Sequence, residues 1–361
     1  MRNFVRLRLH KALCTLKTEI MEKIGFGIIG TGNITEWFLE GARQDPRFEA
    51  RAIYSRTEER GRWFASEHGI ERSYTSLDRM LEDPAIKAVY IASPNYAHTR
   101  QAIKCMESGL HVLCEKPMAS NAREVRMMAE SARRNGVLLM EAMIATLNPN
   151  FGRLRENLAR AGKLRRYFAS YCQYSSRYDR YKQGELPNAF NPELSNGAVM
   201  DIGIYTIYPM VALFGRPQTV SATGLVLPSG ADGQGAVNFT YPGMNATVMY
   251  SKIANSYLPV EIEGEAGNIT ADTIHTIRKL AFVPRPAPSS GRPVEVMAED
   301  ISVPLEYNRY YYEVREFIDL LEEGKTESAI NTLDNSLATA EIIDEIRRQL
   351  GVVYPADKCD C

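Results

Sequence analysis

The chain has 361 residues, of which 45% are hydrophobic and 24% are charged, and its formal net charge is -1. This length allows two hydrophobic cores, and the near-neutral charge excludes a strongly basic protein that binds nucleic acid or an acidic membrane through net charge. The six cysteines are scattered apart from Cys359 and Cys361, so we predict neither a disulfide framework nor a metal site. We expect reduced thiols and a cytoplasmic location.

The segment 1–22 is basic and precedes the first predicted strand. Its apolar runs are too short for a signal-peptide core or a membrane span, while Glu19 and the scarcity of serine argue against a transit peptide. We interpret it as an N-terminal extension with Met21 as the natural start. A chain that begins at Met21 is expected to keep its activity and melting temperature.

The first predicted strand, Phe26 to Ile29, leads directly into a glycine turn and a helix. Gly30 allows the tight turn, and Gly32 lets the backbone approach a pyrophosphate without a Cβ in the way. The amides that open the helix attract phosphate. Thr35 replaces the third glycine of the usual fingerprint, so the stretch is also compatible with an ordinary strand–turn–helix connection. The predicted phosphate-binding residues are Gly30, Thr31, Gly32, Asn33 and Ile34.

A second strand, Glu49 to Tyr54, ends at Ser55 and Arg56. In a dinucleotide-binding fold this strand end lies beside the adenosine ribose, where proteins that prefer NAD place a carboxylate. A hydroxyl and a guanidinium would instead bind a 2′-phosphate, with help from Arg60 one helical turn further on. Ser55 and Arg56 therefore predict NADP, with NAD as a possible second cofactor, although Arg56 could also be a solvated surface residue.

Short apolar strands then alternate with helices as far as Ala142, which is typical of a parallel, doubly wound sheet. Two of these strands end in polar stretches that carry candidate cofactor-binding residues. A lysine at the carboxyl end of a parallel strand points into the cofactor crevice, where its ammonium can stabilise an alkoxide. The same lysine could equally lie in a surface turn. These stretches are Ser93, Pro94, Asn95 and His98 after 88–92, and Glu115, Lys116 and Pro117 after 111–114.

From about Asn148 the pattern changes to longer alternating runs, which indicate an antiparallel or mixed sheet. The strands are expected over 167–176, 235–241, 246–253 and 258–262, and the last two helices over about 308–322 and 332–350. We therefore divide the chain into an extension (1–22), a nucleotide-binding domain (23–145) and a second α/β domain (146–361).

An apolar segment from Gly197 to Phe214 contains Asp201 and Tyr205. On a helix these two residues share one face, with Tyr208 about a turn further. A carboxylate in such a run is costly unless it has a partner, and a phenol can exchange a proton if a cation such as Lys116 lowers its pKa. Tyr205 could also be a core aromatic. The preceding loop offers Arg177, Tyr178, Asp179 and Asn188 as possible polyol-binding or merely solvated residues.

Four motifs in this order resemble the Gfo/Idh/MocA oxidoreductase family: Gly30 to Ile34, Ser93 to Asn95 with His98, Glu115 to Pro117, and Gly197 to Tyr205. The tyrosine at 205, where many members carry histidine, is similar to the dihydrodiol dehydrogenase and glucose-fructose oxidoreductase branch. Two departures stand out. Asn196 replaces the first glycine of a usual Gly-Gly, although asparagine tolerates a positive φ, and no tryptophan follows Ala142.

The resemblance implies a Rossmann domain followed by an α/β domain with a large, open, mixed and mostly antiparallel sheet, and a site between them. It implies an NADP-dependent dehydrogenase that acts on a sugar, polyol or cyclic diol, with Tyr205 moving the proton, Lys116 stabilising the alkoxide and Asp201 orienting. Alternatives are an oxidoreductase with a tightly bound, recycling cofactor and a non-catalytic regulator that senses nucleotide or sugar. The bare face of the open sheet predicts a homodimer or homotetramer.

Overall fold

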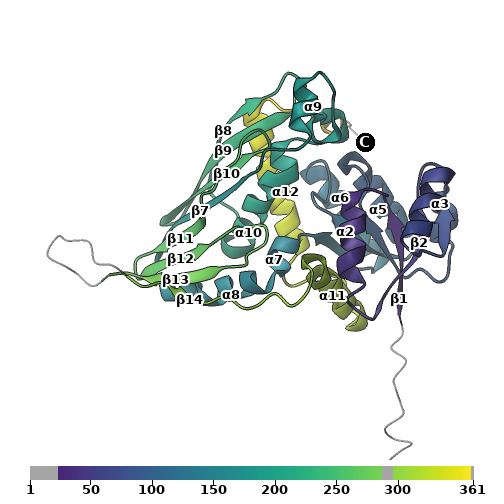
Figure 1. Ribbon diagram of the computed structural model, residues 1–361, viewed down its shortest axis with the longest axis horizontal. Coiled ribbons are helices and arrows are strands. Elements are labelled where there is room, and N and C mark those ends of the chain that lie inside the picture. Colours follow the sequence, from purple (N-terminus) through teal and green to yellow (C-terminus); the bar gives the residue numbers. More distant parts are fainter. Residues whose placement is uncertain (1–22, 287–295, 359–361) are drawn as a thin grey trace, which may run out of the picture.

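The computed structural model describes residues 23–286 and 296–358, and it contains two units that lie side by side, each with its own sheet (Figure 1). The segment 1–22 and its expected dispensability lie outside the described residues. The first sheet is parallel, in the order β3-β2-β1-β4-β5-β6, which confirms the predicted doubly wound arrangement. Its strands are β1 Ile24–Ile29, β2 Phe48–Tyr54, β3 Arg72–Tyr74, β4 Ala88–Ile91, β5 His111–Glu115 and β6 Leu139–Ala142.

Helices bury both faces of this sheet. One face packs against α2 (Asn33–Ala42) and α3 (Glu58–Glu67), and the other against α4 (Leu77–Leu81), α5 (His98–Glu107) and α6 (Ala122–Asn135). A helix from near the carboxyl end, α11 (Arg309–Glu322), completes the first of these cores, where its Phe317 packs against Phe26. The chain therefore returns to the first unit after it has built the second.

The second sheet has the order β14-β13-β12-β11-β7-β10-β9-β8, with β7 and β10 parallel and the other neighbours antiparallel. The mixed, mostly antiparallel sheet is therefore confirmed. We did not expect β8, which is largely exposed and rich in Ser, Thr and Gly. The strands are β7 Leu164–Cys172, β8 Thr219–Val226, β9 Asp232–Tyr241, β10 Met244–Ser251, β11 Val260–Gly264, β12 Gly267–Ala271, β13 Leu280–Pro284 and β14 Glu299–Asp300.

Helices cover only one face of this second sheet, the face toward the first unit (Figure 1). Inward-facing residues such as Tyr167, Val237 and Val248 are fully buried against them. Of the helices that the structure describes, none is long and apolar enough to cross a membrane. The helices of this unit are α7 Ile144–Leu147, α8 Pro149–Asn157, α9 Tyr178–Lys182, α10 Ile204–Phe214 and α12 Leu333–Leu350, and α12 also contacts α6 of the first unit.

The segment that carries Asp201 begins as a π-helix, Val199–Gly203, and continues as α10. A buried carboxylate holds its amino end, because Asp232 Oδ2 accepts a hydrogen bond of 2.7 Å from the Val199 amide. We expected Asn196 to supply a positive φ before this helix, and that was wrong. Ser195 takes the left-handed conformation instead (φ 55°), so the turn falls one residue earlier.

Gly197 has a different reason to be glycine. An added Cβ would lie far inside van der Waals contact of Asp232 Oδ1, and that carboxylate is held by the Val199 amide. Close approach of the carboxylate, rather than an unusual φ, therefore requires glycine at this position.

We predict that Gly197→Ala lowers the free energy of unfolding by about 1–3 kcal/mol, the usual cost of an extra methyl group in a packed interior. Gly152→Ala is the matched control, since Gly152 lies within α8 and its Cβ position has no atom within 4 Å. Alanine there should be neutral or stabilising by up to about 1 kcal/mol. Thermal unfolding checks both, and a Gly197→Ala protein as stable as wild type would show that Asp232 moves aside freely.

Candidate active site

The three predicted catalytic residues lie together where the carboxyl end of β5 faces the helical segment 199–214. Lys116 follows β5 directly, and its Nζ donates a hydrogen bond of 2.9 Å to the backbone oxygen of Asp201. The same Nζ lies 3.4 Å from Asp201 Oδ1 and 4.9 Å from the centroid of the Tyr205 ring. A cation, a carboxylate and a phenol therefore share one site between the two units.

A second lysine, which sequence reasoning missed, completes this group. Lys252 follows β10 directly, and its Nζ donates to Asp201 Oδ2. The sequence predicted a strand over 246–253, which placed Lys252 inside the strand and not at its end, so no sequence signal marked it. The carboxylate of Asp201 thus has one ammonium group on each oxygen.

The charges in this cluster stabilise one another. Burial by itself would raise the pKa of Asp201, but Lys252 and then Lys116 outweigh it and hold that pKa well below its usual range. Burial would likewise lower the pKa of Lys116, but Asp201 and Glu115 raise it above the usual value. Both lysine and carboxylate are therefore ionised at neutral pH, as a mutually paired buried group should be.

We expected Lys116 to lower the pKa of Tyr205, and that expectation was wrong. Burial first, and then the Glu115 carboxylate, raise the pKa of Tyr205 well above the usual value. The physical reason is geometric: Lys116 Nζ lies 4.9 Å from the ring centroid and donates to Asp201, so it does not pair with the phenol oxygen. Tyr205 is therefore a neutral O–H group that can donate a proton.

Aromatic and basic side chains surround this phenol. Tyr171 of β7 lies 5.7 Å from Tyr205 between ring centroids and stacks on His275 at 4.2 Å. Burial, Arg309 and Arg278 lower the pKa of His275 to about 4, so this imidazole is neutral. Sequence reasoning missed Tyr171, His275 and Arg309, which no motif marks. Tyr208, in contrast, is fully buried with its hydroxyl 3.5 Å from Ser336 Oγ, and acts in packing.

The glycine turn has the geometry of a phosphate-binding loop. Gly30 has a φ of 116°, and a Cβ there would meet the Ala92 backbone. A Cβ on Gly32 would meet nothing within 4 Å, so that face of the turn is open next to the amides of Asn33 and Ile34, which begin α2. Thr35 is buried and its hydroxyl donates to the Gly30 oxygen at 3.1 Å. The residue at the third glycine position thus braces the turn.

At the end of β2, Ser55 is buried and Arg56 is exposed. Neither residue is acidic, so the chemistry of this strand end fits a 2′-phosphate. Arg60 has another task, because its Nε lies 3.2 Å from Thr31 Oγ1 and its NH2 group donates to the Thr31 oxygen. Arg60 braces the glycine turn, which leaves Arg56 as the freer guanidinium.

The polar residues after β4 mainly fasten loops to one another. His98 is buried, with Nδ1 3.0 Å from the Pro117 oxygen and Nε2 2.8 Å from the Ser93 oxygen. Asn95 Nδ2 donates to the Ser195 oxygen of the second unit at 2.8 Å. The 93–98 loop, including Pro94, therefore holds the Lys116 turn and the 195–197 turn in register.

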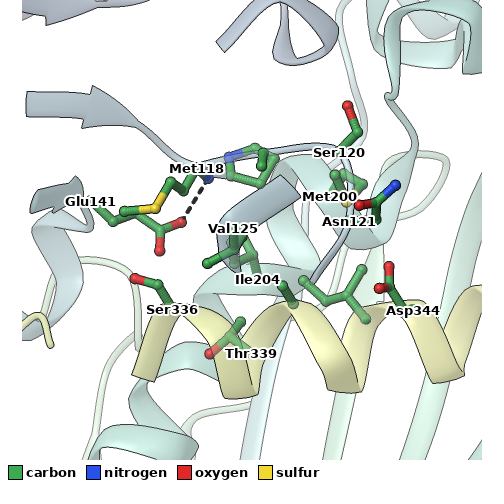
Figure 2. A pocket seen from close by; sticks show the side chains of 14 residues that line it. Met118, Ser120, Asn121, Val125, Glu141, Met200, Ile204, Ser336, Thr339 and Asp344 are labelled. Atoms are coloured by element: carbon green, nitrogen blue, oxygen red, sulfur yellow. Dashed lines mark hydrogen bonds between the residues drawn. The ribbon is translucent and has the colours of Figure 1, made fainter. Parts of the chain in front are cut away.

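Two buried carboxylates support the Lys116 turn from below. Glu115 accepts hydrogen bonds from Tyr90 Oη at 2.7 Å and from the Lys116 amide at 3.2 Å. Glu141, at the end of β6, accepts one from the Met118 amide at 2.9 Å and faces Ser336 of α12 (Figure 2). Burial raises the pKa of Glu141 to about 7. The pocket of Figure 2 lies between the turn that follows Lys116 and helix α12, and its lining includes Glu141.

The loop that was expected to border the substrate pocket holds four candidate residues, and two of them, Tyr178 and Asp179, contact other residues of the same loop. Tyr178 packs against Phe190, with 5.6 Å between ring centroids, and Asp179 pairs with Lys182 at 2.7 Å. Asn188 begins a short 3-10 turn that leads to Phe190, and Arg177 precedes α9. Phe190 brings the loop to the site, since its ring centroid lies 6.0 Å from Lys252 Nζ. Met143, where a tryptophan is often seen, is buried in the second core.

Two protein-family models match successive parts of this chain. The model of the oxidoreductase family with an NAD-binding Rossmann fold matches residues 24–143, and that of the GFO/IDH/MocA C-terminal domain matches 157–270. The scyllo-inositol 2-dehydrogenase (NADP(+)) IolU of Bacillus subtilis is 48% identical over 335 residues, which cover 93% of this chain and 99% of that protein.

A more distant relative and a solved structure each match more than nine-tenths of the chain. The trans-1,2-dihydrobenzene-1,2-diol dehydrogenase of Sus scrofa is 29% identical and covers 92% of this chain and 99% of its own. A levoglucosan dehydrogenase in complex with NADH and levoglucosan has a TM-score of 0.78 at 19% identity, over 91% of this chain and 98% of that one. With both family models matched in order, the chain belongs to the Gfo/Idh/MocA family of oxidoreductases.

Proposed function

We propose that the protein is an NADP-dependent dehydrogenase acting on the CH–OH group of a sugar, polyol or cyclic diol. The observation that carries this proposal is the meeting of Lys116, Asp201 and Tyr205 at the carboxyl end of β5. The 48% identity to a scyllo-inositol dehydrogenase supports the substrate class. Incubating the protein with NADP or NAD and a panel of inositols, aldoses and cyclic 1,2-diols, while following nicotinamide absorbance, tests the proposal directly.

The residues present fit a dinucleotide with a 2′-phosphate. The open face at Gly32 and the amino end of α2 would take the pyrophosphate, and Ser55 with Arg56 would take the 2′-phosphate. When bound, the cofactor supplies a hydride or accepts one at the nicotinamide ring. The side chains of this protein would move the proton and stabilise the charge on the substrate oxygen.

In the direction of ketone reduction, the neutral phenol of Tyr205 donates its proton to the substrate oxygen as a carbonyl becomes a carbinol. The ammonium of Lys116 stabilises the negative charge that develops on that oxygen in a partly buried site. Asp201 holds Lys116 through its backbone oxygen and side chain. Burial and then Glu115 raise the pKa of Tyr205, so the phenol is protonated at neutral pH and holds the proton that the substrate oxygen receives.

Tyr205→Phe should lower kcat by about 10²–10⁴-fold, the usual contribution of general acid–base catalysis. Lys116→Met should lower it at least as much, and the double variant should be little worse than the worse single one, because residues that act as a unit are non-additive. The dissociation constant for NADPH, measured by fluorescence, should hardly change. Near-normal kcat for Tyr205→Phe would assign the proton to another group, and near-normal kcat for Lys116→Met would contradict the role proposed for Lys116.

Arg56→Ala should weaken NADPH binding by about 1–3 kcal/mol, the range for losing a charge-assisted hydrogen bond, while NADH binding stays the same. Arg62→Ala is a matched control, since that arginine of α3 is highly exposed and pairs with Glu58. Isothermal titration with both nucleotides measures the effect. Equal affinity of the wild-type protein for NADPH and NADH would contradict the assignment of Ser55 and Arg56.

We also propose a homodimer or homotetramer that buries the uncovered face of the second sheet (Figure 1). A groove on this face is lined in part by Leu225, Ala236 and Met249, and monomers seldom expose large apolar patches. A cytoplasmic location is proposed because Cys105, Cys114 and Cys172 are free thiols.

Light scattering on the wild-type protein should therefore give a multiple of the 40.6 kDa chain mass. Met249→Glu should shift the protein toward the monomer, because it places charge on the proposed interface. Met127→Glu, on the exposed side of α6 in the first unit, should leave the mass unchanged. A wild-type monomer at micromolar concentration would argue against the interface.

A further inference from the structure

Asp201 is shared by two ammonium groups that arrive from different sheets. Lys116 follows β5 of the first sheet and contacts Oδ1, whereas Lys252 follows β10 of the second sheet and contacts Oδ2. We propose that Lys252 is a positioning residue, which takes up the charge of Asp201 and so leaves Lys116 free for the substrate. This inference rests on the proposed function of Lys116 and adds a residue that the family motifs do not contain.

The two contacts on the carboxylate are unequal. Lys252 Nζ makes a close ion pair with Oδ2, while Lys116 Nζ stays 3.4 Å from Oδ1, longer than the roughly 2.7–2.9 Å of a good charge-assisted hydrogen bond. The shorter bond of Lys116 goes to the Asp201 backbone oxygen, at 2.9 Å. An ammonium has three donors, so Lys116 keeps donor capacity that the carboxylate does not use.

The surroundings of the two lysines also differ. Lys116 lies against the ring of Tyr205, the proposed proton donor. Lys252 lies on the side of Phe190, and its side chain is only 8% exposed. Its backbone is held on both sides, because its amide donates to the Gly233 oxygen and its oxygen accepts from the Ser175 amide, both at 2.9 Å. Lys252 is therefore a fixed cation beside the carboxylate.

Without Lys252, one carboxylate and one ammonium would remain in a partly buried site. Lys116 would then be the remaining cation of this pair beside Asp201. Its ammonium would move closer to the Asp201 carboxylate and away from the substrate oxygen. The electrostatic effects on Asp201 agree with these different roles of the two lysines, because Lys252 contributes more than Lys116 to lowering the pKa of Asp201. Removing Lys252 should therefore harm catalysis through Lys116, and Asp201 would still have a partner to keep the fold.

The test compares wild type, Lys252→Met and Lys252→Arg, with Lys163→Met as a control that removes an exposed lysine before β7. Using NADPH and a substrate found with the wild-type protein, Lys252→Met should lower kcat by about 10²-fold, the loss typical of a misplaced reacting group. KM and the NADPH dissociation constant should stay within about twofold of wild type. Lys252→Arg should recover much of kcat, because a guanidinium can also pair with Oδ2.

Two further measurements separate this role from simple support of the fold. In a Lys116→Met background, Lys252→Met should cause little further loss of kcat, since its effect passes through Lys116. Crystal structures of wild type and Lys252→Met should show the distance from Lys116 Nζ to Asp201 Oδ1 shortening from 3.4 Å in the variant. This last readout does not depend on activity.

The outcomes are distinct. A raised KM with unchanged kcat would make Lys252 a substrate-binding group, and a fully additive loss in the Lys116→Met background would make it a general support; either overturns the inference. An unchanged Lys116–Asp201 distance overturns it as well. Absence of turnover by the wild-type protein on every substrate would instead refute the proposed function, while the crystallographic distance would still decide how Lys252 acts on Lys116.

Discussion

The charge of one carboxylate, Asp201, connects the two halves of the molecule. Its partners come from the carboxyl ends of strands in two different sheets, Lys116 after β5 and Lys252 after β10. Breaking a buried ion pair by removing one partner is costly, since the remaining charge has lost its solvent. The cluster therefore requires the carboxyl ends of β5 and β10 to stay close to Asp201. Other contacts between the two units keep them there.

Several contacts serve this requirement. The amino end of the helical segment 199–214 is held by Asp232 from β9, with Gly197 leaving room for the carboxylate. Asn331, in the loop before α12, donates to the Glu141 and Met143 oxygens at 3.1 Å, where the chain leaves the first sheet. Helices α11 and α12, late in the chain, pack back onto the first unit. The site is thus assembled from the beginning, the middle and the end of the sequence.

Burial and nearby charges set the protonation states of Tyr205 and Lys116. Burial and the nearby Glu115 keep it protonated, while Lys116 remains charged because Asp201 and Glu115 offset the cost of its burial. A proton donor and a cation therefore stand side by side without a proton passing between them. Such a pair is suited to a substrate oxygen that must receive a proton and have its developing charge stabilised.

The amino-acid sequence by itself determined the parallel sheet and the mixed second sheet, because apolar periodicity and turn residues report local conformation, and its four short motifs indicated the family. It also singled out Lys116, Asp201 and Tyr205, which belong to short motifs. Only the tertiary structure brought in Lys252, Tyr171, His275 and Asp232, whose contacts join residues far apart in the chain. It also decided the pKa of Tyr205 and the position of the turn before Gly197. Burial and charge proximity are properties of the folded chain, and no local pattern of residues contains them.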